Sequence, residues 1–504
     1  MIADILFLPF FAIYLLVIAA LFMYGSNFAY LSYVAVKHGH RHPKRCEPER
    51  WPTVTVQLPM YNEIYVAQRL IDSVAALDYP ADRLEIQVLD DSTDETVGMI
   101  ADMVVRWQGR GVDIVHLRRG DRSGYKAGAL AYGLKTAKGE FLAVLDADFV
   151  PPPDFLKETV PVMVADPGLA FAQARWGHIN RNSSALSRLQ AIAIDSHFTV
   201  EQVGRWAKGL WFNFNGTAGI WRKEAILDAG GWQADTLTED LDVSYRAHLG
   251  GWRSAYIQSL EVPGELPVSF TAFRRQQHRW ARGSLTCARK HLPAVWRADV
   301  SFFHRLSSTL HLSGYSIHIL LLTMSLLYPI MLLMSEQYLD LLRPLWFLAF
   351  FNATALAPTL MFVVGQHQLH RSWLRQLPMI CLLTVFGCGM MLNTTRAAWH
   401  LHRQTPEHFE RTAKFGVTGR QQEEWRQAKY QLRWDPIVVA ELVLAMVNFF
   451  SCFVAVRSGL WGIAAYSGLF GLGLASVSVA TISHGAQLLV AGGSAESEAR
   501  SGVA

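Results

Sequence analysis

Four aspartates in two close pairs are the side chains whose spacing best suits chemistry on a phosphorylated ligand. Asp90 and Asp91 directly follow one β-rich run, and Asp146 and Asp148 directly follow another. Carboxylates at positions i and i+2 on a turn can hold a hard divalent cation that bridges a diphosphate. A single pair is weak evidence, because acidic turns are common and Asp90 also suits an Asx turn that caps a following helix. Two pairs at matching strand ends favour a site for a metal and a nucleotide.

The elements around these acids alternate between strand and helix. Short β-rich runs are predicted at Thr53–Leu58, Leu84–Leu89, Val112–Leu117 and Glu140–Leu145, with helices at about 63–77, 94–108 and 124–137. This alternation predicts a parallel sheet with helices on both faces, which binds ligands beyond the carboxyl ends of its strands. The sequence has neither GxGxxG nor GxxxxGK[ST], so the acidic pairs are the candidates for handling a phosphate.

The composition indicates a soluble domain inserted between membrane segments. Hydrophobic residues make up 51% of the 504 residues and charged residues 17%, and the mean hydropathy is +0.16. Charged residues are scarce in 305–365 and 436–483 but ordinary in 40–300. The net charge of +4 is small for this length and argues against a nucleic-acid partner. Five cysteines without a CxxC pair argue against a disulfide framework or a zinc site.

Six apolar runs are candidates for membrane spans. Residues 5–24 are long enough to cross the bilayer and predict an uncleaved anchor, and the others lie at about 309–333, 344–364, 377–395, 436–456 and 459–482. Six spans would place the eight Lys and Arg residues of 396–433 outside the cell, against the positive-inside rule. We therefore expect the run at 377–395, which contains two glycines, to lie at the interface or to re-enter the membrane. Five spans remain, with an external N-terminus and a cytoplasmic C-terminus.

Two further motifs make a resemblance to a known family specific. Thr238-Glu239-Asp240 and Gln276-Gln277-His278-Arg279-Trp280 complete the ordered set DD, DxD, TED and QxxRW. This set resembles the signature of the processive family 2 glycosyltransferases, the group of cellulose, hyaluronan and chitin synthases. The segments at 57–63, 124–130 and 213–222 (QLPMYNE, GYKAGAL and NFNGTAGIWR) resemble plant cellulose synthase-like A and C proteins, which are mannan, glucomannan and β-1,4-glucan synthases. The resemblance covers about residues 50–300.

The resemblance implies an inverting transfer at a metal site. Asp240 would be the general base that takes the proton of the acceptor hydroxyl, and Glu239 would orient or support it. Asp148, with Asp146 nearby, would hold Mg²⁺ or Mn²⁺, which assists departure of the diphosphate so that no general acid is needed. One-step attack on an α-linked donor gives a β-linkage.

The resemblance also assigns the donor and acceptor contacts. Asp90 and Asp91 would accept hydrogen bonds from the nucleoside, and Lys126 would lie against the nucleotide as a point charge, although outside the family it would be read as an ordinary surface lysine. The amphipathic segment 270–290 would place Trp280 under the acceptor sugar. Its Arg279 and Gln276 would lie near the diphosphate and the acceptor. The alternative is an interfacial helix whose Arg and Trp anchor at lipid headgroups.

A segment near the C-terminal spans resembles a gating loop. Phe415-Gly416-Val417-Thr418-Gly419-Arg420 is similar to the FxVTxK loop of bacterial cellulose synthase, with Arg420 where the family has Lys. Phe415, Val417 and Thr418 would then be loop residues, and Arg420 a donor-binding residue. Arg keeps the charge and offers a bidentate grip on phosphate, so its geometry differs from that of Lys. The alternative interpretation of 411–433 is a solvated basic loop.

Polar residues near or inside the spans have two interpretations. His311, Ser313, Tyr315, Ser316 and His318 would either line the path of a threaded glycan or make hydrogen bonds between helices. Glu441, the acid in the later spans, is expected near enough to the cytoplasmic end of its helix to be hydrated.

The expected fold is an α/β GT-A type nucleotide-sugar transferase domain inserted between transmembrane helices, with about five spans plus amphipathic interface helices. The predicted units are an anchor at 1–36, a cytoplasmic GT-A domain at 50–265, an interface helix with QxxRW at 266–300, two spans at 305–365, an interface helix and gating loop at 375–435, two spans at 436–483, and a flexible tail at 484–504.

The expected function is that of a processive hexosyltransferase in the plasma membrane, or in the inner membrane of a bacterium. It would polymerise a β-linked glucan, mannan or glucomannan, with β-1,4 as the expected linkage, from UDP-glucose or GDP-mannose. The growing glycan would pass through the membrane channel of the same protein. Membrane lipid and the glycan are the other expected partners. One alternative is a non-processive enzyme that adds a single sugar to a lipid. Another is a catalytically dead scaffold or a transporter, against which the intact motifs argue.

Overall fold

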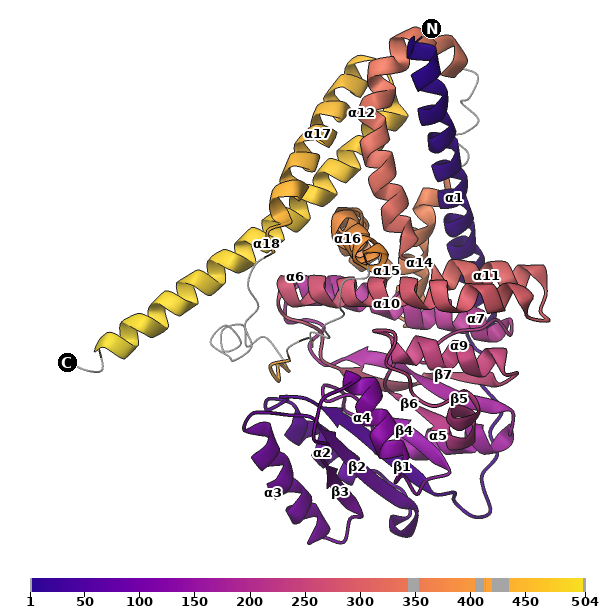
Figure 1. Cartoon of the computed structure of the whole chain (residues 1–504), viewed down its shortest axis with the longest axis vertical. Coiled ribbons are helices and arrows are strands. Elements are labelled where there is room, and N and C mark those ends of the chain that lie inside the picture. Colours follow the sequence, from indigo (N-terminus) through magenta and orange to yellow (C-terminus); the bar gives the residue numbers. More distant parts are fainter. Residues whose placement is uncertain (1, 343–352, 404–411, 413, 419–434, 502–504) are drawn as a thin grey trace.

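The computed structural model describes residues 2–342, 353–403, 412, 414–418 and 435–501, and its soluble part is built on a mixed sheet (Figure 1). The strands are β1 (Val54–Met60), β2 (Leu84–Asp90), β3 (Ile114–Leu117), β4 (Phe141–Val144), β5 (Leu169–His178), β6 (Gly219–Arg222) and β7 (Arg253–Gly264). Their order in the sheet is β3-β2-β1-β4-β6-β5-β7. The first four match the predicted runs and pair in parallel, as expected.

The second half of the sheet differs from the prediction of a parallel sheet. Strand β6 pairs antiparallel with both β4 and β5, so the sheet is mixed. This strand has four residues and carries Trp221, which is fully buried. A strand that is buried on both faces lacks an alternating pattern, which explains why the sequence did not show it.

Helices cover both faces of the sheet. One core cluster packs the sheet against α2 (Ala67–Ala75), α3 (Thr96–Gln108) and α5 (Phe155–Ala165). The other face packs against α4 (Tyr125–Leu134), α8 (Lys223–Asp228) and α9 (Glu239–Leu249). A continuous helical stretch follows β5 and consists of α6 (Ala185–Ser196), a π-helical segment His197–Gln202 and α7 (Val203–Ala207). Leu31 and Ala35 of α1 (Ile2–His38) belong to the second cluster, so this membrane helix ends packed on the soluble domain.

Helix α10 (Phe270–Arg297) lies between the sheet and the membrane helices (Figure 1). Its apolar and polar positions alternate with helical period, which confirms the helix expected at 270–290 and extends it. Helices α11 (Phe302–Leu312) and α12 (Ser316–Leu342) follow, and α12 rises away from the soluble domain beside α1. The QxxRW motif therefore lies where the soluble and membrane parts meet.

Five helices of the described residues are long and apolar enough to cross a membrane: Leu8–His38, Ser316–Met334, Trp373–His402, Val438–Arg457 and Trp461–His484. Four correspond to predicted spans, and Trp373–His402 takes the place of the expected 344–364. Residues 343–352 lie outside the described part of the chain, and the helix that follows them, α14 (Ala357–Gln368), has 12 residues. The chain is thus a membrane protein by the length and composition of these helices. Residues 484–501, predicted as a flexible tail, continue α18 (Trp461–Ser501).

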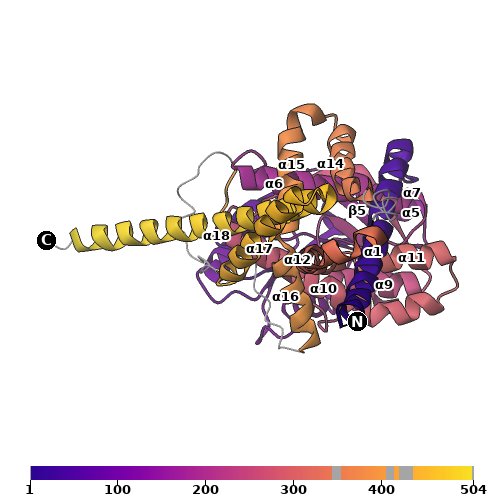
Figure 2. The same ribbon diagram turned by 90° about the horizontal axis from the view of Figure 1, so that it is seen from above.

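The segment Trp373–His402 is made of α15 (Trp373–Gly389) and α16 (Met391–His402). Helix α16 is seen end-on in Figure 1 and lengthwise in Figure 2, so it lies across the direction of α1 and α12. Asn393 of α16 donates to the backbone oxygen of Arg274 in α10 at 3.1 Å, which ties the two helices together. The expectation that 377–395 lies at the interface falls mostly on α15, and because Trp373–His402 is also long and apolar enough to cross a membrane, it stays a prediction.

A buried ion pair joins α10 to the last two membrane helices. Arg274 donates to both carboxylate oxygens of Glu441 in α17 (Val438–Arg457), and at 2.7 Å to Thr481 Oγ1 in α18. Both charged side chains are at most 1% exposed. The expectation that Glu441 is hydrated is therefore wrong, because α10 brings it a partner that hydropathy along α17 does not reveal.

Removing one member of this pair should be strongly destabilising. We expect Arg274→Met to lower the free energy of unfolding by about 3–5 kcal/mol, because Glu441 becomes an uncompensated buried charge. The double variant Arg274→Met/Glu441→Leu should recover most of the loss, since neither charge remains. The midpoint of thermal unfolding in detergent measures both effects. A double variant no more stable than Arg274→Met would show that the ion pair is not the cause.

Candidate active site

A pocket lies beyond the carboxyl ends of β1 and β4 and is closed on the membrane side by α10. The predicted residues that line it are Asp91, Lys126, Asp146, Asp148, Glu239, Asp240, Gln276, Arg279 and Trp280. They come from five separate parts of the chain, which the strands and α10 bring to one edge of the sheet. The structure therefore gathers most of the predicted site in a single cavity.

Each aspartate of the DxD motif is bound by a lysine. Lys126 Nζ, at the start of α4, lies 2.5 Å from Asp146 Oδ1 and 3.7 Å from Glu239 Oε1. Lys414 Nζ lies 2.5 Å from Asp148 Oδ2. Asp146 is held from the other side, because its backbone N–H donates to Thr217 Oγ1 at 2.8 Å. The two carboxylates already attract cations, and their oxygen atoms are the ligands that Mg²⁺ and Mn²⁺ prefer.

The predicted base, Asp240, lies in the first turn of α9 beside these charges. Its Oδ1 accepts from the backbone N–H of Leu241 at 2.8 Å. A Cβ added at Gly216 would lie 3.0 Å from Asp240 Oδ2 and 3.3 Å from Lys126 Nζ, and Gly216 has a φ of +81°. Only glycine adopts this positive φ without strain and leaves room for the two side chains. Gly216 therefore allows its loop to approach Asp240 closely. Neighbouring Glu239 is 7% exposed.

The surroundings of Asp240 disfavour its charge. Burial and the adjacent Glu239 raise the pKa of Asp240 to about 7, against the opposing effect of Lys126. A carboxyl group with a pKa near neutrality is matched to accepting a proton at physiological pH. The same burial also raises the pKa of Asp146.

The first aspartate pair divides into a buried and a pocket-lining member. The Asp90 side chain is fully buried beneath the pocket, where it accepts from Ser92 N at 2.8 Å and lies 2.9 Å from His116 Nε2. This is the Asx turn that the residue types suggested. Asp91 lines the pocket and is held by Arg119, which donates to both carboxylate oxygens at 2.7 and 2.5 Å. Arg119 was not predicted, because its partner lies 28 positions away.

The described part of the proposed gating loop lies against the pocket. Phe415 N donates to Glu265 Oε1 at 2.9 Å, and the Phe415 ring lies 6.2 Å from that of Tyr65. Val417 is buried, and Thr418 is the last described residue of the segment. Arg420 lies outside the described residues. Lys414, which sequence reasoning missed, directly precedes the motif and is the residue that reaches the DxD carboxylate.

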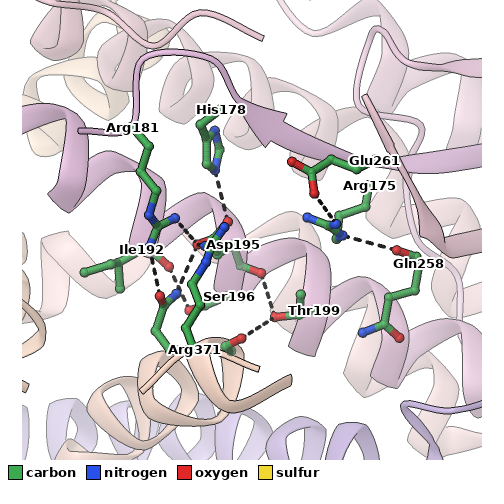
Figure 3. Close-up of polar contacts among 12 residues, drawn as sticks. Arg175, His178, Arg181, Ile192, Asp195, Ser196, Thr199, Gln258, Glu261 and Arg371 are labelled. Atoms are coloured by element: carbon green, nitrogen blue, oxygen red, sulfur yellow. Dashed lines mark hydrogen bonds and ion pairs between the residues drawn. The ribbon is translucent and has the colours of Figure 1, made fainter. Parts of the chain in front are cut away.

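The wall of the pocket at the end of β5 is fixed by a buried carboxylate (Figure 3). His178 lines the pocket, and its Nε2 lies 3.1 Å from Asp195 Oδ1 in α6. Arg181 and Arg371 bind the other oxygen of Asp195 at 2.5 and 2.7 Å. These cations and His178 hold the pKa of Asp195 well below its usual range despite its burial. Arg371 follows α14, so this cluster connects the pocket wall to the membrane part.

A cluster of Asp242, Cys287 and His291 behind the pocket has the residue types of a metal site, with ligand atoms within 4.8 Å of one another. Asp242 is already neutralised, since Lys290 Nζ and Arg246 Nη2 lie 2.6 and 2.7 Å from it. Burial raises the pKa of Cys287 to about 12, which keeps the thiol protonated. We therefore interpret this cluster as structural support for α9.

Two of the polar residues near the spans make contacts between helices. Tyr245 Oη lies 2.7 Å from His311 Nδ1, and Tyr24 Oη lies 2.7 Å from Ser313 Oγ. The first contact joins α9 to α11, and the second joins α1 to the end of α11. For these two residues the structure favours the helix-to-helix interpretation.

Family models match the chain over both its soluble and membrane parts. Residues 52–283 match a model described as glycosyltransferase like family 2, and residues 221–484 match the cellulose synthase model. The mixed sheet and its acidic carboxyl edge define a GT-A type glycosyltransferase with membrane helices. The chain belongs to the cellulose synthase family.

Curated relatives match about half of the chain. Glucomannan 4-beta-mannosyltransferase 1 of Oryza sativa subsp. japonica is 43% identical over 267 residues, which are 50% of this chain and 51% of that protein. Glucomannan 4-beta-mannosyltransferase 9 of Arabidopsis thaliana is 46% identical over 244 residues, 48% of this chain and 46% of that protein. The chain thus spans about half the length of the curated relatives it matches.

Among solved structures, a mannosyltransferase from Pyrobaculum calidifontis in complex with GDP-Man and Mn²⁺ is similar with a TM-score of 0.49 and 20% identity. The match covers 78% of this chain and 99% of that one.

Proposed function

We propose that this chain is an inverting, processive glycosyltransferase that builds a β-1,4-linked glycan from a sugar nucleotide on the cytoplasmic side of a membrane. The observation that carries the proposal is the shared pocket of Asp240, the DxD pair and the QxxRW residues, at the base of the membrane helices. The names of the relatives favour a mannosyl donor and a mannan or glucomannan product. GDP-mannose is then the expected donor, with UDP-glucose as the alternative.

The pocket residues have different roles in the transfer of the sugar. Asp240 accepts the proton of the acceptor hydroxyl as that oxygen attacks the anomeric carbon, and Glu239 and Lys126 hold Asp240 in place. Trp280 offers a flat apolar face for the acceptor sugar, and Arg279 offers positive charge for the diphosphate. Asp91, positioned by Arg119, contacts the nucleoside, and buried Asp90 supports that turn.

A divalent cation fits the DxD pair. Asp146 and Asp148 would hold Mg²⁺ or Mn²⁺, which neutralises the diphosphate as it leaves. The positive charges of Lys126 and Arg279 offset the negative charges of the neighbouring carboxylates. Gln276 orients the acceptor sugar. Phe415, Val417 and Thr418 contribute a segment beside the donor site, and the donor contact predicted for Arg420 lies outside the described residues.

Product analysis with each donor tests the proposal. Purified protein in detergent or nanodiscs receives radiolabelled GDP-mannose or UDP-glucose with Mn²⁺, and the product is separated by solubility and size. We expect an insoluble or high-molecular-weight glycan that β-mannanase degrades, or β-glucanase if UDP-glucose is the donor. Label that partitions into organic solvent as a lipid bearing one sugar would replace this proposal with a lipid glycosyltransferase.

The raised pKa of Asp240 predicts how the rate depends on pH. A base works only when deprotonated, so kcat/KM should fall as pH drops through about 7, by about tenfold per pH unit on the acid side. Above that value the rate should level off. Initial rates between about pH 5.5 and about pH 8.5 measure this profile. A rate that is flat across the range would show that Asp240 does not titrate there.

A further inference from the structure

The ammonium group of Lys414 lies beside Asp148, the proposed metal ligand. Without it, the Asp148 carboxylate would attract a cation from solution. Its side chain is 9% exposed and lies 2.5 Å from Asp148 Oδ2. The same ammonium group donates to the backbone oxygen of Glu265, and the next residue, Phe415, donates from its N–H to Glu265 Oε1. Three contacts on two residues therefore seat Lys414 on the pocket.

Four Lys and Arg side chains of the described residues line the pocket, Arg122, Lys126, Arg279 and Lys414, and they belong to different elements. Lys126 belongs to α4 and Arg279 to α10, and both interact with Asp146, Glu239 and Asp240. Lys414 lies in a segment, 414–418, without helix or strand, and its carboxylate contact is to Asp148. Lys414 can therefore leave Asp148 without disturbing a helix or the compensation of the predicted base.

A divalent ion and the Lys414 ammonium cannot both use Asp148 without strong repulsion. A metal bound to Asp148 Oδ2 would lie about 2.0–2.2 Å from it, and Lys414 Nζ lies 2.5 Å from the same oxygen, so the two positive charges would be about 5 Å apart at most. Like charges at that distance in a partly buried pocket repel by several times the thermal energy. This repulsion favours the departure of one of the two cations.

We propose that Lys414 is the built-in counter-ion of Asp148, and that a divalent cation binds by displacing it. This inference rests on the proposed metal-dependent function of the same pocket. Metal binding and the seating of residues 414–418 then oppose each other. By linkage, each weakens the other by the same factor. The segment 414–418, which contains the start of the FxVTxK-like motif, thereby responds to the metal before any sugar is transferred.

Removing the ammonium group should tighten metal binding. Mn²⁺ alone is titrated into the full-length protein, and free Mn²⁺ is counted from its electron paramagnetic resonance signal. We expect Lys414→Met to lower the Kd for Mn²⁺ by at least about fivefold, the lower end of ordinary coupling between sites. Lys414→Arg, which keeps the charge, should bind Mn²⁺ like the unaltered protein. Lys157→Met serves as a matched control, because Lys157 pairs with Asp78 on the surface.

The possible outcomes distinguish failure of the Lys414 displacement from failure of the proposed metal-dependent transfer. An unchanged or weaker Mn²⁺ affinity in Lys414→Met, in a protein whose turnover needs metal and whose thermal midpoint is unaltered, would overturn the displacement and leave the proposed function standing. Turnover that persists in chelator, with no Mn²⁺ bound by any variant, would overturn both. A variant that fails to fold is replaced by Lys414→Gln, which is judged by the same shift in Kd.

Discussion

Replacing Asp240 with Asn is expected to reduce turnover by at least about 10²-fold, which is the usual contribution of a general base. The amide matches the carboxylate in shape, so it should still accept from Leu241 N as Asp240 does at 2.8 Å. It cannot take the proton of the attacking hydroxyl, and the acceptor remains a poor nucleophile. The measurement is kcat with saturating donor.

Two controls make the Asp240→Asn result specific. Donor binding, measured by calorimetry, should be retained, because the nucleotide contacts proposed for Asp91 and Arg279 are intact. Asp235→Asn makes the same chemical change on an exposed side chain of the preceding loop, which pairs with Lys290, and should keep near-normal turnover. A rate close to that of the unaltered protein in Asp240→Asn would assign the base elsewhere.

Loss of the metal site should have an effect at least as large. We expect chelation with EDTA to abolish transfer and added Mg²⁺ or Mn²⁺ to restore it, because the diphosphate leaves without a general acid. Asp148→Ala should lower turnover by about 10³-fold or more, if metal assistance contributes about 4 kcal/mol to the transition state. Excess metal should not rescue it, since a ligand is missing. Turnover is measured across a range of metal concentrations.

The same substitution at a neighbouring acid provides the comparison. Asp154 is exposed after the same strand, at the start of α5, and Asp154→Ala should leave the metal requirement unchanged. Cys287→Ser tests the buried cluster in the same way and should not alter metal dependence. Full activity of Asp148→Ala in the presence of chelator would exclude the metal-assisted departure of the diphosphate.

The parts of the fold that the sequence predicted are those set by local pattern. The first four strands have alternating or continuous apolar runs bounded by turns, and they form β1 to β4 nearly where expected. Helix α10 was visible because its apolar residues recur with helical period. Strand β6 has four residues, and its antiparallel pairing with β4 joins residues that are at least 75 positions apart, which local pattern cannot show.

The site divides in the same way. Asp146 and Asp148 were predicted because their motif is short and stands at a strand end, and Asp240 because the TED motif completes the set that resembles the family. Arg119 and Lys414 were missed because their partners are supplied by the fold, and Lys414 lies 266 positions from Asp148. Hydropathy identified the apolar run within Trp373–His402, but it indicates how long an apolar helix is and not how that helix is oriented relative to the membrane. The orientation of α16 is set by its packing on α10, through contacts such as Asn393 with Arg274.

Product length at low conversion is the measurement that tests processive synthesis most directly. The enzyme receives radiolabelled donor, the reaction is stopped when only about one chain per enzyme molecule has been made, and the products are separated by size. An enzyme that holds its glycan on the Trp280 face between additions should give long chains from the start, with few short intermediates. A ladder of short oligosaccharides that lengthens with time, or a single sugar on a lipid, would contradict the account.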